Sequence, residues 1–138
     1  MQIAAVVVAW ALTAFLALTY LKAGRFKLTA PIQTLVEAGM GWTAKAGKGT
    51  VRVIALLELL GAAGIVLAPI ASEFLGLAWA QVWGVAAAAG LVAVMVVAII
   101  MHAARGETKY TWKINLYLLL ASIALTILLA LFGGSVFN

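Results

Sequence analysis

The sequence predicts an all-α, polytopic membrane protein: a bundle of four transmembrane helices with a short interfacial amphipathic helix in the first cytoplasmic loop. Two observations carry this prediction. The 138 residues are 67% hydrophobic and 9% charged, whereas a soluble domain is about 45–50% apolar and about 25% charged. Four apolar segments also have the length that a bilayer requires, about 20 residues each. A chain of this size has room for one domain, residues 1–138.

The four predicted spans are residues 3–21, 51–71, 81–102 and 115–132. Because no water is present in lipid to satisfy the backbone, these segments must be helices. The first apolar run has about 18 residues and no basic residues before it. A secretory signal peptide has a basic start and a shorter apolar core, so we expect this run to be a retained first span.

The positive charges predict the orientation in a bacterial-type inner membrane. All nine Lys and Arg residues lie in or directly beside residues 22–50 and 103–114, and the connection at residues 72–80 has none. Basic residues collect in cytoplasmic loops. We therefore expect residues 22–50 and 103–114 in the cytoplasm and both termini outside. The net charge of +5 has the same explanation, and no motif for nucleic acid is present.

The first connection is too long for a simple turn and predicts a helix of its own. Thr29, Ala30 and Pro31 resemble a helix start, since proline is tolerated in the first turn. Apolar residues follow at helical spacing up to Met40, and glycines end the segment. An amphipathic helix in the cytoplasmic interface fits this pattern. The alternative is a lid over a cavity between the helices.

The second span is the most informative segment, because it carries Glu58 in its apolar first half and the small residues Gly61 to Gly64 directly after it. An ionisable group in a span normally faces the protein interior, and small residues allow helices to approach closely. We predict helix packing at Gly61, Gly64 and Gly84. At 1.5 Å per residue, Glu58 lies about 10 Å in from Val51.

Stripes at helical spacing on the other spans place further polar groups in the same, cytoplasmic half. The predicted ligand-binding or buried polar cluster is Glu58, His102, Asn115, Tyr20 and Arg105, and the stripe of the fourth span runs on through Ser122 and Thr126 to Gly133. Three readings of Glu58 stay open: a pair that holds the helices in register, a proton-handling or ligand-holding carboxylate, and an exposed side chain that reaches the interface. For His102, a solvated or capping role is the simplest interpretation.

The same residues carry a resemblance to a known family. Residues 58–69, ELLGAAGIVLAP, resemble the signature of the DoxX-like membrane proteins, and His102, Arg105, Gly106 and Glu107 resemble that family's H-x-x-R-G-(E/D) turn after the third span. Asn115 at the start of the fourth span also fits. Further matches are Lys27 with Leu28, the turn at residues 39–42, and Arg52.

The resemblance implies four transmembrane helices, but it does not imply one activity. Relatives in this family include a subunit of thiosulfate:quinone oxidoreductase and an animal assembly factor for acetylcholine receptors, and some bacterial relatives are linked to redox stress in larger membrane complexes. The bundle is also similar to four-helix quinone and thiol enzymes, which need cysteines. This chain has none, which disfavours a self-contained thiol oxidoreductase.

Three functions follow as hypotheses. The leading one is a non-enzymatic accessory or scaffold subunit that binds a partner membrane protein, or a lipophilic molecule such as a quinone or lipid, between its helices. The second is a quinone-linked oxidoreductase subunit in which Glu58 and His102 exchange protons. The third is a transporter or channel formed by a homo-oligomer, which four spans without an inverted repeat disfavour. No catalytic residue, metal site or obligatory cofactor is predicted.

Overall fold

The computed structural model describes residues 2–132, which form five helices: α1 (Gln2–Thr29), α2 (Ile32–Glu37), α3 (Trp42–Leu75), α4 (Trp79–Ala104) and α5 (Thr108–Phe132). All except α2 are long and apolar enough to cross a membrane. The prediction of a four-helix membrane bundle is therefore confirmed. Gly133, the last member of the polar stripe predicted on the fourth span, lies outside the described residues.

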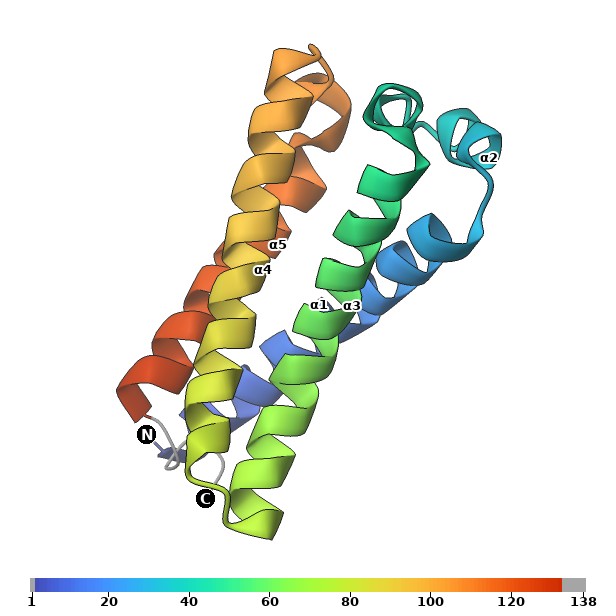
Figure 1. The fold of residues 1–138 in the computed structure, drawn as a ribbon. Coiled ribbons are helices and arrows are strands. Elements are labelled where there is room, and N and C mark those ends of the chain that lie inside the picture. Colours follow the sequence, from blue (N-terminus) through green and yellow to red (C-terminus); the bar gives the residue numbers. More distant parts are fainter. Residues whose placement is uncertain (1, 133–138) are drawn as a thin grey trace.

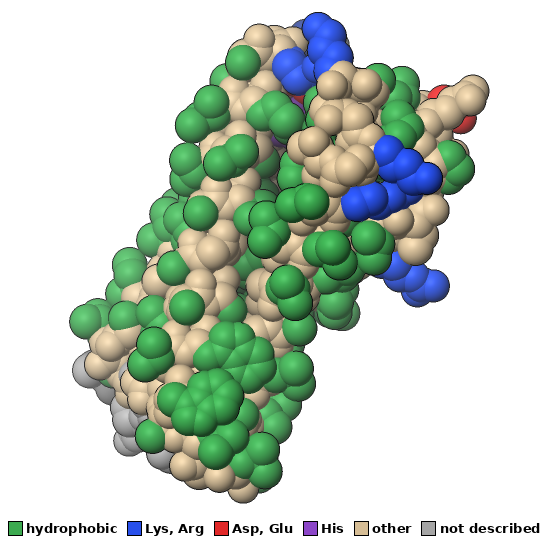
Figure 2. Space-filling model, in the orientation of Figure 1, with side chains coloured by type: hydrophobic (Ala, Val, Ile, Leu, Met, Phe, Trp, Pro, Cys, Tyr) green, Lys and Arg blue, Asp and Glu red, His purple; other side chains and the backbone are tan. Residues whose placement is uncertain are grey.

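The four long helices alternate in direction and are joined by short turns, except where α2 separates α1 from α3 (Figure 1). The first residues of α1, the turn between α3 and α4, and the end of α5 lie at one end of the molecule. Helix α2 and the turn between α4 and α5 lie at the opposite end. Lys and Arg side chains gather at this second end, while hydrophobic side chains cover the rest of the visible face (Figure 2). This arrangement is typical of a membrane bundle with one basic face.

Every long helix begins earlier or ends later than its apolar segment. Helix α1 continues from Leu21 to Thr29, and α3 begins at Trp42, nine residues before Val51. Hydropathy reports only the part of a helix that suits lipid, and charged residues such as Lys and Arg are good helix formers outside it. Much of the predicted first loop is therefore helical.

The start of α3 is a separate short turn. Gly47 has φ 82° and ψ 159°, which breaks the helix between Trp42 and the long membrane segment. A side chain at this φ would be strained, so glycine fits this break. The long segment then runs through Pro69 to Leu75, beyond residue 71, where the second span was predicted to end.

Helix α2 is shorter than the sequence predicts. It begins after Pro31, whose φ and ψ of −60° and 151° are extended, and ends at Glu37. Gly39 follows with φ 94°, which reverses the chain in a conformation that glycine adopts without strain. Leu35 is fully buried and packs with Trp42 and Val51. The apolar face of α2 therefore rests on α3.

The three predicted packing glycines lie at the contact between α3 and α4. A Cβ atom on Gly61 would stand 2.5 Å from Cδ2 of Leu91, and one on Gly64 would stand 2.6 Å from Cβ of Ala87. For Gly84 the nearest atom is Cβ of Ala68, at 3.2 Å. Small residues thus bring these two helices into close contact, as expected where lipid provides no hydrophobic drive for association.

Candidate functional sites

Glu58 forms a buried ion pair with Lys27. Nζ of Lys27, near the end of α1, lies 2.5 Å from Oε1 of Glu58 on α3. The two side chains are only 10% and 7% exposed. Two charges cost several kcal/mol each to bury, and close contact between them offsets that cost. The pair therefore holds the C-terminal part of α1 against α3.

Two neighbouring residues hold α1 in the position that this pair requires. A Cβ atom on Gly24 would meet the carbonyl oxygen of Ala55 at 3.1 Å and Cγ of Leu59 at 2.9 Å, so glycine permits the close approach of α1 and α3. The Arg52 guanidinium donates hydrogen bonds to the carbonyl oxygens of Lys27 and, at 2.8 Å, Ala30. These carbonyls belong to the end of α1, where no further helical turn satisfies them.

Tyr20 and Thr13 extend the polar interior deeper into the bundle. They lie on the inward face of α1, seven residues apart, and each is 1% exposed. The Tyr20 hydroxyl lies close to the Ser122 hydroxyl and interacts electrostatically with the Glu58 carboxylate. It makes no hydrogen bond of good geometry with any of the described residues. The Ser122 hydroxyl instead donates to the carbonyl of Leu118 at 2.7 Å.

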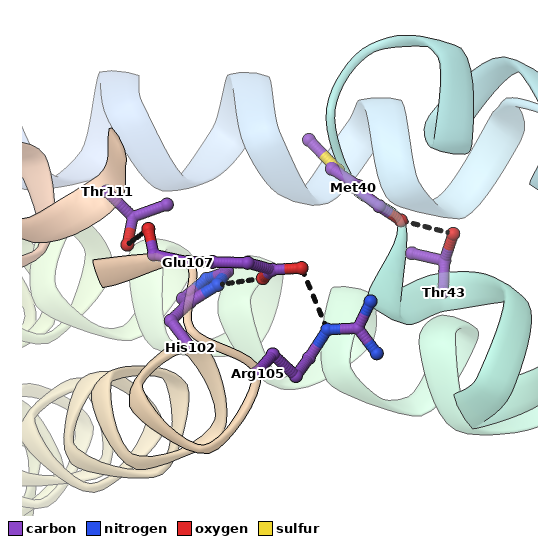
Figure 3. Close-up of polar contacts among 6 residues, drawn as sticks. All are labelled: Met40, Thr43, His102, Arg105, Glu107 and Thr111. Atoms are coloured by element: carbon purple, nitrogen blue, oxygen red, sulfur yellow. Dashed lines mark hydrogen bonds and ion pairs between the residues drawn. The ribbon is translucent and has the colours of Figure 1, made fainter. Parts of the chain in front are cut away.

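His102 and Arg105 belong to a second cluster, at the turn between α4 and α5. Both bind the Glu107 carboxylate: Nδ1 of His102 lies 2.8 Å from Oε2, and Nε of Arg105 donates to Oε1 at 2.8 Å (Figure 3). These hydrogen bonds, first that of His102, hold the pKa of Glu107 below its ordinary value of 4.5. A carboxylate acceptor favours the tautomer with its proton on Nδ1, which leaves Nε2 as an acceptor in the neutral ring.

Arg105 also links this turn to the start of α3. Its guanidinium points toward the segment that holds Met40 and Thr43 (Figure 3). A Cβ atom on Gly41 would lie 3.4 Å from Nη2 of Arg105. The turn of residues 105–107 and the turn that follows α2 are thus neighbours, although they are about 65 residues apart in the chain.

A pocket of about 190 Å³ lies between the end of α4 and the start of α5. Its surface is almost entirely apolar, although polar residues are among those that line it: Ile99, His102, Thr108, Thr111, Trp112, Asn115 and Leu116. Asn115 is 8% exposed, and Trp112 is 48% exposed. The pocket lies beside the turn between α4 and α5, at the basic end of the bundle.

The five residues predicted as one polar cluster therefore fall into two groups. Tyr20 lies beside Glu58 in the interior, whereas His102 and Asn115 line the pocket, with Arg105 at the adjoining turn. The partner of Glu58 is Lys27, and neither His102 nor Asn115 makes a hydrogen bond with it in the described part of the chain.

Lys27 and Glu107 were missed as members of these sites. Lys27 was assigned to a loop, because the apolar run ends near Leu21. The missed signal is the spacing of Thr13, Tyr20 and Lys27, seven residues apart on one helix face. Glu107 was part of the recognised motif, and its position five residues after His102 indicated the contact.

The sequence model of the DoxX-like family matches residues 11–133. This range contains all four candidate spans apart from the first residues of α1, together with both polar groups. The chain belongs to the DoxX-like family. Searches of curated proteins and of solved structures found no significant match. The DoxX-like signature at residues 58–69 thus contains the buried Glu58 and two glycines of the α3–α4 contact, and its second motif forms the His102–Arg105–Glu107 turn.

Proposed function

We propose that this DoxX-like protein is a non-enzymatic accessory subunit of the inner membrane that holds a lipophilic molecule, by its polar headgroup, in the pocket between α4 and α5. The pocket lined by His102 and Asn115 is the observation that supports the proposal. Binding sites for small molecules are typically mostly apolar, with a few convergent polar groups that fix orientation.

The composition of the pocket suits an amphiphile. The pocket surface is almost entirely apolar and includes Ile99, Trp112 and Leu116. Asn115, in the pocket wall, carries an amide that can donate and accept hydrogen bonds. Nε2 of His102 is an acceptor when Nδ1 donates to Glu107. A headgroup with a hydroxyl or carbonyl oxygen can bind these groups while its tail stays in lipid.

The size of the pocket limits what enters it. A cavity of roughly 150 Å³ already accommodates benzene, so a pocket of about 190 Å³ admits one substituted ring or a comparable headgroup. The remainder of a long lipophilic molecule would lie along the exposed faces of α4 and α5, where Val96, Ile100 and Leu120 are exposed.

Extraction from native membranes into polymer nanodiscs, without detergent, tests the proposal. Native mass spectrometry should detect a stoichiometric lipophilic molecule, a partner chain, or both. Recovery of a bare protein with only bulk lipids, in bulk proportions, would contradict it.

A quinone-linked oxidoreductase subunit is the second candidate, and the ring-sized pocket beside His102 favours it. A quinone carbonyl could accept a proton through a histidine at this position. His102→Ala should then abolish quinone-dependent electron transfer in the isolated complex. Because Glu58 belongs to the interior group, Glu58→Gln tests whether that carboxylate also exchanges protons. Unchanged electron transfer in both variants would exclude the candidate.

A further inference from the structure

Three buried polar atoms in the interior of the bundle have no hydrogen-bond partner among the described residues: Oγ1 of Thr13, Oη of Tyr20 and Oε2 of Glu58. Their residues are 1%, 1% and 5% exposed. An unsatisfied buried donor or acceptor costs about 1–3 kcal/mol, more when it is charged. Inside a bilayer these atoms cannot be hydrated by bulk water, so we expect each of them to have a hydrogen-bond partner.

The two atoms at Tyr20 and Glu58 belong together. Gly24 on α1 packs against Ala55 and Leu59, so Tyr20, one turn earlier on α1, stands level with Glu58 and the following turn of α3. The carboxylate and the phenol also interact electrostatically. Thr13 lies two turns further from the cytoplasmic end, about 10 Å along the helix.

The polar groups at this site determine which ligand it can bind. Oε1 of Glu58 is paired with Lys27, so the ion pair is already neutral, and an additional ion would leave an uncompensated charge in lipid. Oε2 is an acceptor and requires a donor. The Tyr20 hydroxyl can donate or accept. A neutral hydroxyl group meets all three conditions.

We propose that the interior between α1 and α3 binds a hydroxyl group, which donates to Oε2 of Glu58 and hydrogen-bonds with Oη of Tyr20. Its source is either an internal water molecule or the hydroxyl headgroup of a membrane amphiphile. This site is separate from the pocket between α4 and α5 and does not depend on the function proposed for that pocket.

Removal of the Tyr20 hydroxyl distinguishes an occupied site from a dry one. Stability should fall if the site is occupied, whereas it should rise or stay the same if the site is dry. In a dry interior, Tyr20→Phe removes an unsatisfied group and stabilises the protein or leaves its stability unchanged. With a bound hydroxyl group, the variant loses a hydrogen bond, and the folding equilibrium constant should fall roughly five-fold. Thr13→Val is the matched control. It removes another unpartnered hydroxyl on the same helix face, but one that is too far away to contact the bound hydroxyl group.

Unfolding of the full chain in bilayers, followed with purified lipid and again with native lipid extract, identifies the source. If Tyr20→Phe is less stable than the parent in both lipids, and nuclear magnetic resonance detects magnetisation transfer from water protons to the Glu58 side chain, the bound group is water. A loss only in native extract would indicate a hydroxyl-bearing amphiphile, detectable by mass spectrometry. If Tyr20→Phe is as stable as the parent, or more stable, in both lipids, as expected for Thr13→Val, the proposal is wrong.

Discussion

Lys27 and Glu58 are the two residues whose contact determines how α1 meets the rest of the bundle. Each would be very costly to bury alone, and each lies in a helix that is otherwise suited to lipid. Glycine at position 24 and the Arg52 hydrogen bonds to the end of α1 support the same contact. The ion pair therefore fixes the register of the antiparallel helices α1 and α3 relative to each other.

Lys27→Met should destabilise the bundle by about 3–5 kcal/mol, because it leaves the Glu58 carboxylate buried without its cation. The double variant Lys27→Met, Glu58→Leu should recover most of this loss, since two apolar side chains replace the pair. Reversible unfolding in mixed micelles measures both values. The control is Lys22→Met, an exposed lysine on the same helix, for which we expect little change. A single variant as stable as this control would contradict the role of the pair.

Glu107, at the turn between α4 and α5, should make the stability of the fold decrease in acid. Its folded pKa is lowered by His102 and Arg105, so its carboxylate stabilises the fold above the ordinary value of 4.5 and this contribution is lost as pH falls through the lowered pKa. The side chain is 26% exposed, and solvent screening keeps the contribution small. Unfolding titrations between about pH 6 and about pH 3 should show a steeper fall in stability for the parent than for Glu107→Gln. Parallel curves would refute this assignment.

At the scale of the element, the contact between α3 and α4 depends on a glycine at each of three levels along the helices. Gly61, Gly64 and Gly84 face Leu91, Ala87 and Ala68, respectively. The three contacts differ in how far the opposing atom can yield. Leu91 is a long side chain with other rotamers, whereas the Cβ atom of Ala87 can move only with its helix.

Gly64→Ala should therefore push the helices apart and cost about 1–3 kcal/mol, the usual range for overpacking. Gly90→Ala is the matched control, because a Cβ atom there meets nothing within 4 Å. Alanine at that exposed helical position should be neutral or stabilise by up to about 1 kcal/mol. Equal effects of the two substitutions on unfolding would show that helix propensity, and not close packing, governs this interface.

The elements also show what the sequence could and could not predict. Apolar length and composition predict four spans, because lipid imposes both. They do not predict where helices end, since Lys22, Arg25 and Lys27 are compatible with helix and end only the apolar run. The partner of Glu58 was missed for this reason. The sequence predicted His102 and Asn115 as site residues but did not predict the pocket itself, because a cavity volume depends on how two helices pack.

At the scale of the whole molecule, the charge distribution predicts the orientation. The basic residues lie at the end of the bundle formed by α2 and the α4–α5 turn (Figure 2). The chain has no cysteine, so single cysteines report on topology without background. In intact cells, an impermeant maleimide should label Leu77→Cys and leave Lys48→Cys unlabelled until the membrane is opened. The reverse labelling pattern would show that the protein is inverted.

The binding of a lipophilic molecule at the α4–α5 pocket is the central claim, and its stoichiometry in native nanodiscs tests it most directly. Native mass spectrometry should find close to one such molecule per protein in the parent. Asn115→Leu, which fills the pocket and removes its amide, should lose it, while Leu18→Ile, on the exposed face of α1, should retain it. Equal occupancy in the parent and in Asn115→Leu, or no bound molecule in any of the three proteins, would contradict the account.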